Sequence, residues 1–229
     1  MNKKRLFTDE QLREMERPYL DLIEEAIDAG DKDRAKKLVR RFNDIALANQ
    51  DMYVKWVTSD LSFIGRNFGD KAVEDALRAF FTPFMKEGAR VFQGTDEDGI
   101  RLKLKALLTA LKNHLVPVRI TEDDEKFVLE MQPCGTGGRL INSKGYEDNY
   151  NLLKIKKPQA MTCGQADFPA YCAHGPVVAM VTTEMTGAPF FFEEPSTDLG
   201  KVPCKFYLYK NPMDAPEALY AKVGKKKKA

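Results

Sequence analysis

The residues most able to carry out chemistry lie close together late in the chain. Cys163, Asp167, Cys172 and His174 fall within a dozen positions, and the whole sequence has only two histidines and four cysteines. Thiolate, carboxylate and imidazole groups bind divalent metals and carry out nucleophilic catalysis. The segment therefore indicates a Cys/His site.

Two chemistries fit this site, and the sequence leaves both open. In the first, Cys134, Cys172 and His174, with Cys163 as a further candidate, bind a divalent metal, most simply zinc, which activates water at an open position. In the second, no cofactor is needed: Cys172 is a thiolate nucleophile, His174 or a helix N-terminus lowers its pKa, and Asp167 orients the imidazole. The spacings match no strong zinc signature.

A glycine-rich segment provides the second candidate feature. It reads Cys134, Gly135, Thr136, Gly137, Gly138, Arg139. Successive glycines let backbone N–H groups converge on an anion, and an arginine can bind a carboxylate through two parallel hydrogen bonds. The segment lacks the ending and the glycine spacing of nucleotide-binding loops. We therefore expect Gly135–Arg139 to bind a small anionic substrate, with a tight turn as the alternative.

The remaining candidates have weaker patterns. His114 ends a predicted helix, where an imidazolium would interact favourably with the helix dipole. Cys163 and Cys204 also fit buried structural positions, because free cysteine is one of the most buried residue types. Asp167 or Glu184 could position a water molecule in either mechanism.

The first half of the chain must supply helices to hold this site. Apolar residues recur at helical spacing over five stretches, 8–29, 31–46, 53–64, 70–88 and 96–111. Pro18 should bend or split the first of them, since proline removes a backbone donor. These amphipathic faces predict a helical region over residues 1–117, packed as a bundle.

The second half changes character at Pro117. Alternating apolar residues over 118–121 and 126–131 predict a β-hairpin, and 190–193 with 204–209 predict a second pair of strands. We expect a helix between Tyr150 and Lys156, and a mobile basic tail over 216–229. The predicted fold is α+β: an N-terminal helical bundle packed on a C-terminal antiparallel sheet with helices, the region 118–215 carrying the Cys/His site.

Composition excludes several classes of function. With 36 Lys+Arg against 34 Asp+Glu the net charge is only +2, so no broad positive face for nucleic acid is expected. No apolar stretch approaches the ~20 residues that span a membrane, and the N-terminal residues lack the apolar segment of a signal peptide. We expect a cytoplasmic protein that acts on a small molecule. The sequence is compatible with a homo-oligomer.

Several segments together resemble a known family. Gly65–Arg78, Pro133–Arg139 and Pro169–Cys172, followed by Gly200–Tyr207, resemble the L-2-amino-thiazoline-4-carboxylic acid hydrolase-like family over roughly residues 40–210. The ending is also similar to the small-molecule-binding 4-vinyl reductase domain. The first resemblance implies hydrolysis of a C–N bond in a small carboxylated ring.

The sequence thus leads to two functional hypotheses. The first is a hydrolase in which Arg139 and the glycine-rich segment hold an anion while Cys172, His174 and Cys134 carry out the chemistry. The second is a non-catalytic small-molecule-binding or sensory domain of the 4-vinyl reductase type. Aromatic residues such as Phe190, Phe191, Phe192 and Tyr207 would then line its pocket, although alternate residues of a strand face opposite ways.

Overall fold

The computed structural model describes residues 5–88, 91–92, 94–131, 133–147 and 150–227. The chain divides into two compact units, residues 1–50 and 51–229. The division lies inside a helix rather than at residue 117, where the sequence changes character, so the second unit combines helices from before that point with all the strands.

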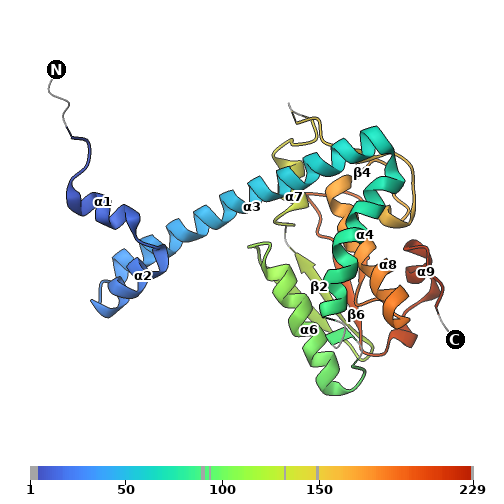
Figure 1. Ribbon diagram of the computed structural model, residues 1–229. Coiled ribbons are helices and arrows are strands. Elements are labelled where there is room, and N and C mark those ends of the chain that lie inside the picture. Colours follow the sequence, from blue (N-terminus) through green and yellow to red (C-terminus); the bar gives the residue numbers. More distant parts are fainter. Residues whose placement is uncertain (1–4, 89–90, 93, 132, 148–149, 228–229) are drawn as a thin grey trace. The chain divides into compact units, whose positions relative to one another are not determined.

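The first three helices are α1 (Asp9–Glu16), α2 (Tyr19–Asp28) and α3 (Lys32–Phe68), shown in Figure 1. The predicted break at Pro18 is confirmed: α1 ends at Glu16, and Pro18 is the N-cap residue of α2. The two helices predicted over 31–46 and 53–64 form one helix of 37 residues. No glycine or proline lies between residues 31 and 64 to interrupt it.

Three helices of the second unit pack with the sheet: α4 (Asp70–Glu87), α6 (Glu97–Lys112) and α8 (His174–Thr186). Asp96 caps α6 by accepting a hydrogen bond from the Gly99 amide at 2.9 Å. Gly88 follows α4 as predicted, whereas Pro83 lies inside the helix and does not end it.

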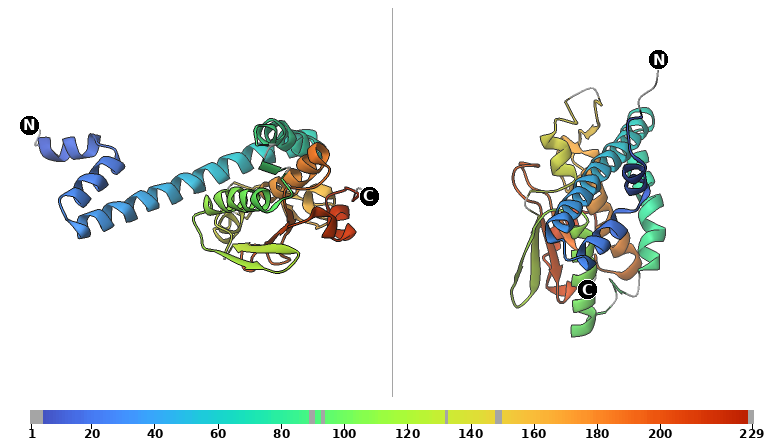
Figure 2. Two further views of the ribbon diagram at one scale, coloured as in Figure 1. Left: turned by 90° about the horizontal axis from the view of Figure 1, so that it is seen from below. Right: turned by 90° about the vertical axis from the view of Figure 1, so that its left-hand side faces the viewer.

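A four-stranded antiparallel sheet has the order β1-β2-β6-β5. Its strands are β1 (Val118–Glu122), β2 (Lys126–Met131), β5 (Phe192–Glu194) and β6 (Lys205–Tyr209). Both predicted strand pairs are confirmed, and Leu129 pairs with Phe206 on the face toward the core. Figure 2 shows α4, α6 and α8 on one face of the sheet, and the α+β prediction is confirmed.

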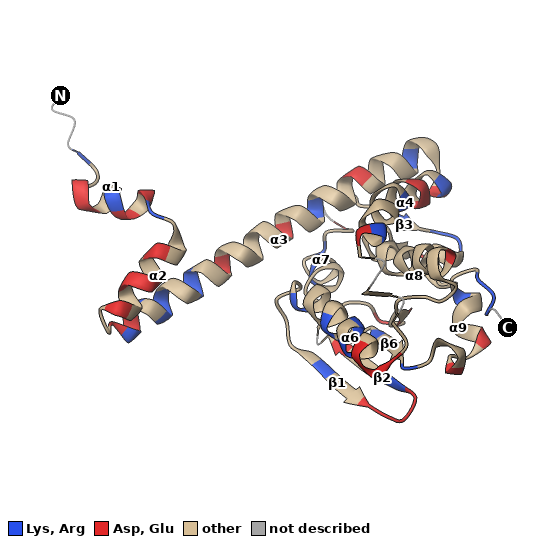
Figure 3. Ribbon diagram, turned by 60° about the horizontal axis from the view of Figure 1, so that its bottom comes forward, with Lys and Arg blue, Asp and Glu red and all other residues tan. Residues whose placement is uncertain are grey.

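Helix α8 is the main element that the sequence pattern did not reveal. Nine of its 13 residues are buried, and Glu184 is its only charged side chain (Figure 3). A helix that is apolar on all sides has no amphipathic period to recognise. Its C-terminus at Gly187 adopts a φ of 85°, a conformation that favours glycine.

Shorter elements connect these parts. They are α7 (Gly137–Asn142), a pair of two-residue strands, β3 (Lys154–Ile155) and β4 (Phe168–Pro169), and 3₁₀ turns at Ala160–Thr162, Ala170–Ala173 and Pro212–Asp214. The helix expected between Tyr150 and Lys156 is wrong, because β3 lies there and pairs with β4. Backbone pairing with a distant segment has overridden the local preference.

The C-terminal segment also differs from the expected mobile tail. Residues Glu217–Lys222 form α9, and Tyr220 is only 1% exposed. Its ring packs edge-on against Phe192, with 5.0 Å between ring centroids. Within the described residues, no helix combines the length and the apolar character that crossing a membrane requires.

We predict that α9 contributes to stability. Replacing Tyr220 with Ala should lower the free energy of unfolding by about 3 kcal/mol, because it leaves a cavity beside Phe192 and Tyr209. Urea unfolding followed by circular dichroism measures this change. Lys226→Ala, at an exposed position four residues past α9, should change stability by less than about 0.5 kcal/mol. Equal effects of the two variants would contradict a structural role for α9.

Candidate functional site

A cavity of about 180 Å³ lies in the second unit between helices α4, α6 and α8 and the sheet. Its lining is mainly apolar and aromatic, including Phe81, Met85, Leu107, Met131, Val178, Phe190, Phe191 and Phe206. Three predicted site residues, Cys134, Cys172 and His174, line this one cavity. Thr136, Gly137 and Gly138 of the glycine-rich segment line it as well.

Four parts of the chain supply its polar groups. The loop after β2 brings Cys134, and the turn after α6 brings His114. The 3₁₀ turn Ala170–Ala173 carries Cys172 directly into α8, whose first residue is His174. Strand β5 brings Glu193 from the sheet.

The glycines allow these segments to lie in close contact. A Cβ atom on Gly137 would come within 2.7 Å of the Cys172 sulfur, and one on Gly135 within 1.9 Å of the His114 carbonyl oxygen. A Cβ atom on Gly138 would likewise lie 2.9 Å from the Cβ of Cys134. Both distances at Gly135 and Gly137 are below those that real Cβ atoms adopt. These glycines therefore serve close packing within the cavity wall.

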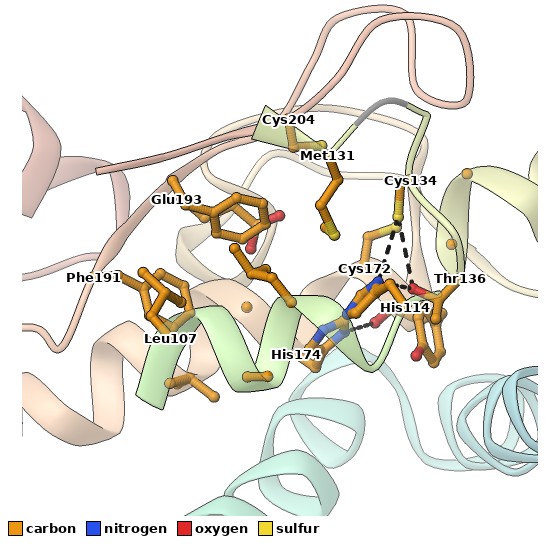
Figure 4. Close-up of a pocket in the computed structure, with 18 of the residues that line it drawn as sticks. Leu107, His114, Met131, Cys134, Thr136, Cys172, His174, Phe191, Glu193 and Cys204 are labelled. Carbon is orange, nitrogen blue, oxygen red and sulfur yellow. Dashed lines mark hydrogen bonds between the residues drawn. The ribbon is translucent and has the colours of Figure 1, made fainter. Parts of the chain in front are cut away.

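His114, Thr136 and Cys134 form a polar cluster on one side of the cavity (Figure 4). The Thr136 hydroxyl oxygen lies 2.9 Å from His114 Nδ1, and the Cys134 sulfur lies 3.6 Å from that hydroxyl and 4.0 Å from Nδ1. Burial, with a smaller effect of the Arg139 charge, lowers the pKa of His114 to about 4. His114 lies just past the end of α6, as expected, but as a neutral group in the cavity wall rather than a charge on the helix dipole.

His174 is also neutral, and only one of its ring nitrogens has a hydrogen-bond partner within the described part of the chain. Its Nδ1 donates a hydrogen bond to the Tyr171 carbonyl oxygen at 2.6 Å, which leaves Nε2 as the acceptor. Burial lowers the pKa of His174 to about 4. The ring stacks on that of Phe81 at an interplanar angle of 24°, with 6.3 Å between centroids.

Two cysteines of the cavity, Cys172 and Cys204, are protonated rather than activated. Burial is the main cause that raises the pKa of the Cys172 thiol well above its ordinary value, and it raises that of Cys204 to about 12. Cys163 does not line the cavity; its thiol is buried and lies 3.7 Å from the Glu193 carbonyl oxygen. This electrostatic environment opposes the predicted role of Cys172 as a thiolate nucleophile.

Glu193 is a site residue that the sequence analysis missed. It lines the cavity on the side opposite Cys134 and His114 in Figure 4, and burial, with a smaller effect of Cys134, raises its pKa to about 8. Its pairing with Phe206 places it on the core-facing side of the sheet. Parity alone could not have indicated this position, because Phe191 and Phe192 alternate in the side they face and both are buried.

Three predicted site residues lie away from the cavity. Arg139 pairs with Asp51, its Nε 2.7 Å from a carboxylate oxygen, and Asp167 pairs with Lys156 at the surface. Glu184 pairs with Arg78 on the outer side of α8. None of the three lines the cavity, so Arg139 is not placed to hold an anion there, nor Asp167 to orient His174.

The metal-binding hypothesis finds no support in the geometry. Across the described residues, no three His, Cys, Asp or Glu side chains come together in an arrangement that could hold a metal ion. Cys134, Cys172 and His174 share a cavity without forming a common ligand set. We therefore derive no chemistry through zinc.

Comparison of the chain with models of protein families, with curated proteins and with solved structures found no match. The two family resemblances stay predictions.

We predict that Glu193 makes stability depend on pH. Its pKa is raised from 4.5 to about 8 on folding, so the folded state binds more protons between these values. Its stabilising effect is complete below pH ~4.5 and is lost as pH rises through ~8. Relative to wild type, Glu193→Gln should gain up to about 4 kcal/mol of unfolding free energy between pH 5 and 9.

Urea unfolding across this range measures the gain. Glu194→Gln is the matched control, because Glu194 is partly exposed and pairs with Lys222 and Tyr207. Its curve should stay parallel to that of the wild type over the same range. If the unfolding free energy of Glu193→Gln also differed from that of the wild type by the same amount at every pH, Glu193 would not titrate in this way.

Proposed function

We propose that this protein binds a small, mostly apolar organic molecule in the cavity lined by α4, α6, α8 and the sheet. The observation that carries the proposal is the composition of that cavity: an apolar and aromatic wall with a few polar groups directed inward. Binding sites for small molecules generally have this character. The apolar wall supplies affinity by excluding water, and the polar groups orient the ligand.

The size of the cavity limits the ligand. An engineered cavity of about 150 Å³ in another protein holds benzene, and the cavity here measures about 180 Å³. A single ring with one short substituent therefore fits. Aromatic side chains from α4 and from the segment before β5, among them Phe81 and Phe190, can pack against such a ring.

The protonation states favour binding over catalysis. Both imidazoles have a pKa of about 4, so they are weak bases at neutral pH. Cys172 and Cys204 remain thiols. These properties support a binding or sensory domain, the alternative that the 4-vinyl reductase resemblance implies.

We predict that covering the cavity blocks binding. Ala110 lines the cavity yet is exposed, so it lies at the opening. Ala110→Trp should weaken the binding of benzyl alcohol at least tenfold, because the indole ring covers the opening or enters it. Thr109→Trp, one residue away on the same helix but outside the cavity lining, should leave binding unchanged. Calorimetric titration measures both, and equal affinities would contradict the cavity as the site.

A second candidate is the hydrolase, and one observation favours it: Cys134 lies beside His114. The Cys134 sulfur would add to the carbon of the scissile C–N bond while its proton passes to His114. That proton would then leave with the nitrogen, and water would hydrolyse the sulfur–carbon bond to restore the thiol. In this second candidate the nucleophile is Cys134 rather than Cys172, a choice supported by the proximity of Cys134 to His114.

This mechanism predicts turnover that depends on Cys134. Cys134→Ser should reduce hydrolysis of L-2-amino-thiazoline-4-carboxylate at least 100-fold, because a hydroxyl is a much weaker nucleophile than a thiol beside a neutral imidazole. Cys163→Ala, outside the cavity lining, is the control and should retain turnover. Ammonia or cysteine derivatives released from the ring report the reaction. No turnover by the wild type would remove this candidate and leave the binding function untouched.

A further inference from the structure

Among the described residues that line the cavity, one carries a carboxyl group and no lysine or arginine lies there to balance it. Among the described residues that line it, Glu193 is the only Asp, Glu, Lys or Arg. Within the described part of the chain, its side chain makes no hydrogen bond or ion pair, although nearby thiols affect it electrostatically. A buried carboxylate without a partner is costly.

The fold holds this carboxyl group in one place. A Cβ atom on Gly175 would lie 1.5 Å from Glu193 Oε2, so only glycine at this position allows the carboxyl group to lie against the first turn of α8. The hydrogen-bonded ladder between β5 and β6 fixes the backbone of Glu193 from the other side. Close contact on one side and sheet pairing on the other direct the side chain into the cavity.

The groups that face Glu193 supply no positive charge. His174 of α8 is neutral, and so is His114 at the end of α6. Cys134, Cys172 and Cys204 contribute only sulfur atoms. The partial positive charge at the start of α8 helps an anion but does not amount to a full counter-charge.

Aromatic rings surround the remaining space. Phe190, Phe191 and Phe206 form a chain of edge-on contacts, with centroids 5.5 and 5.7 Å apart, and all three line the cavity together with Glu193. The faces of aromatic rings attract cations, and the attraction is stronger where water is excluded. An apolar aromatic wall beside a single carboxyl group suits an organic cation.

We propose that the ligand is a small organic ammonium ion, a ring-sized apolar body with an amine that donates hydrogen bonds to the Glu193 carboxylate. This inference rests on the proposed binding function and specifies its ligand class. It reverses the expected charge of the ligand, since an anionic carboxylate would face Glu193 while Arg139 pairs with Asp51. The ammonium ion supplies the counter-charge that the chain itself does not place there.

The positive charge of the proposed ligand makes its affinity depend on pH. Because the pKa of Glu193 is about 8 in the free protein, binding an ammonium ion to its carboxylate releases a proton below that pH. Affinity for the amine therefore rises as pH increases from 6 to 8, while the amine itself stays charged. A ligand that accepts a hydrogen bond from the protonated carboxyl group would show the opposite trend.

The test compares three probes of one shape with the full chain: benzylamine, benzyl alcohol and phenylacetate. Calorimetric titration at pH 6, 7 and 8, in buffers of different ionisation enthalpy, gives affinities and proton release. We expect benzylamine to bind most tightly at pH 8, with an affinity at least tenfold higher than at pH 6 and release of protons on binding. Phenylacetate should bind most weakly of the three.

Matched variants assign the effect to Glu193. Glu193→Gln should lower the affinity for benzylamine at least tenfold and change that for benzyl alcohol less than threefold. Glu194→Gln, whose side chain pairs with Lys222 outside the cavity lining, should change neither. Proton release is measured on the wild type alone, so this measurement still tests the inference if a variant does not fold.

The possible results separate the two proposals. If benzyl alcohol binds but benzylamine binds no more tightly, or if benzylamine is insensitive to pH and to Glu193→Gln, the ammonium inference is overturned and the cavity remains a binding site. Tighter binding of phenylacetate overturns it too and restores an anionic ligand. If none of the three probes binds, the proposed binding function itself is contradicted.

Discussion

The close approach of the glycine-rich segment to its neighbours is the constraint on which the candidate site depends. Gly137 lets the chain contact the Cys172 sulfur, and Gly135 lets it contact the His114 carbonyl. A side chain at either position would push apart the loop after β2, the end of α6 and the start of α8. The residues of the cavity would then no longer face a common space.

Burial then decides the chemical character of that space. In an apolar surrounding the neutral form of each group is favoured, which explains the uncharged His114 and His174, the protonated Cys172 and the raised pKa of Glu193. The same residues in a solvated cleft could act as an acid–base set. Here they form a mostly neutral wall that suits recognition of a ligand, with Glu193 as the one carboxylic acid among the described residues that line it.

Much of the fold follows from local patterns. The helical spacing of apolar residues, the break at Pro18 and the alternation in the strands predicted α1, α2, α6 and the two strand pairs, because these signals act over a few residues. Local patterns failed where long-range packing decides the structure. Helix α8 is apolar on all sides, β3 exists only through its pairing with β4, and α9 is ordered by the contact of Tyr220 with Phe192.

The sequence by itself determined the α+β class and drew attention to Cys134, Cys172 and His174, because residue types and spacing are visible without coordinates. Only the tertiary structure decided which groups share a cavity. In that structure Arg139 forms a salt bridge with Asp51, and Glu193 of strand β5 lines the cavity. The physical reason is that charge, burial and pairing depend on neighbours distant in the chain, and those neighbours are set by the packing of helices on the sheet.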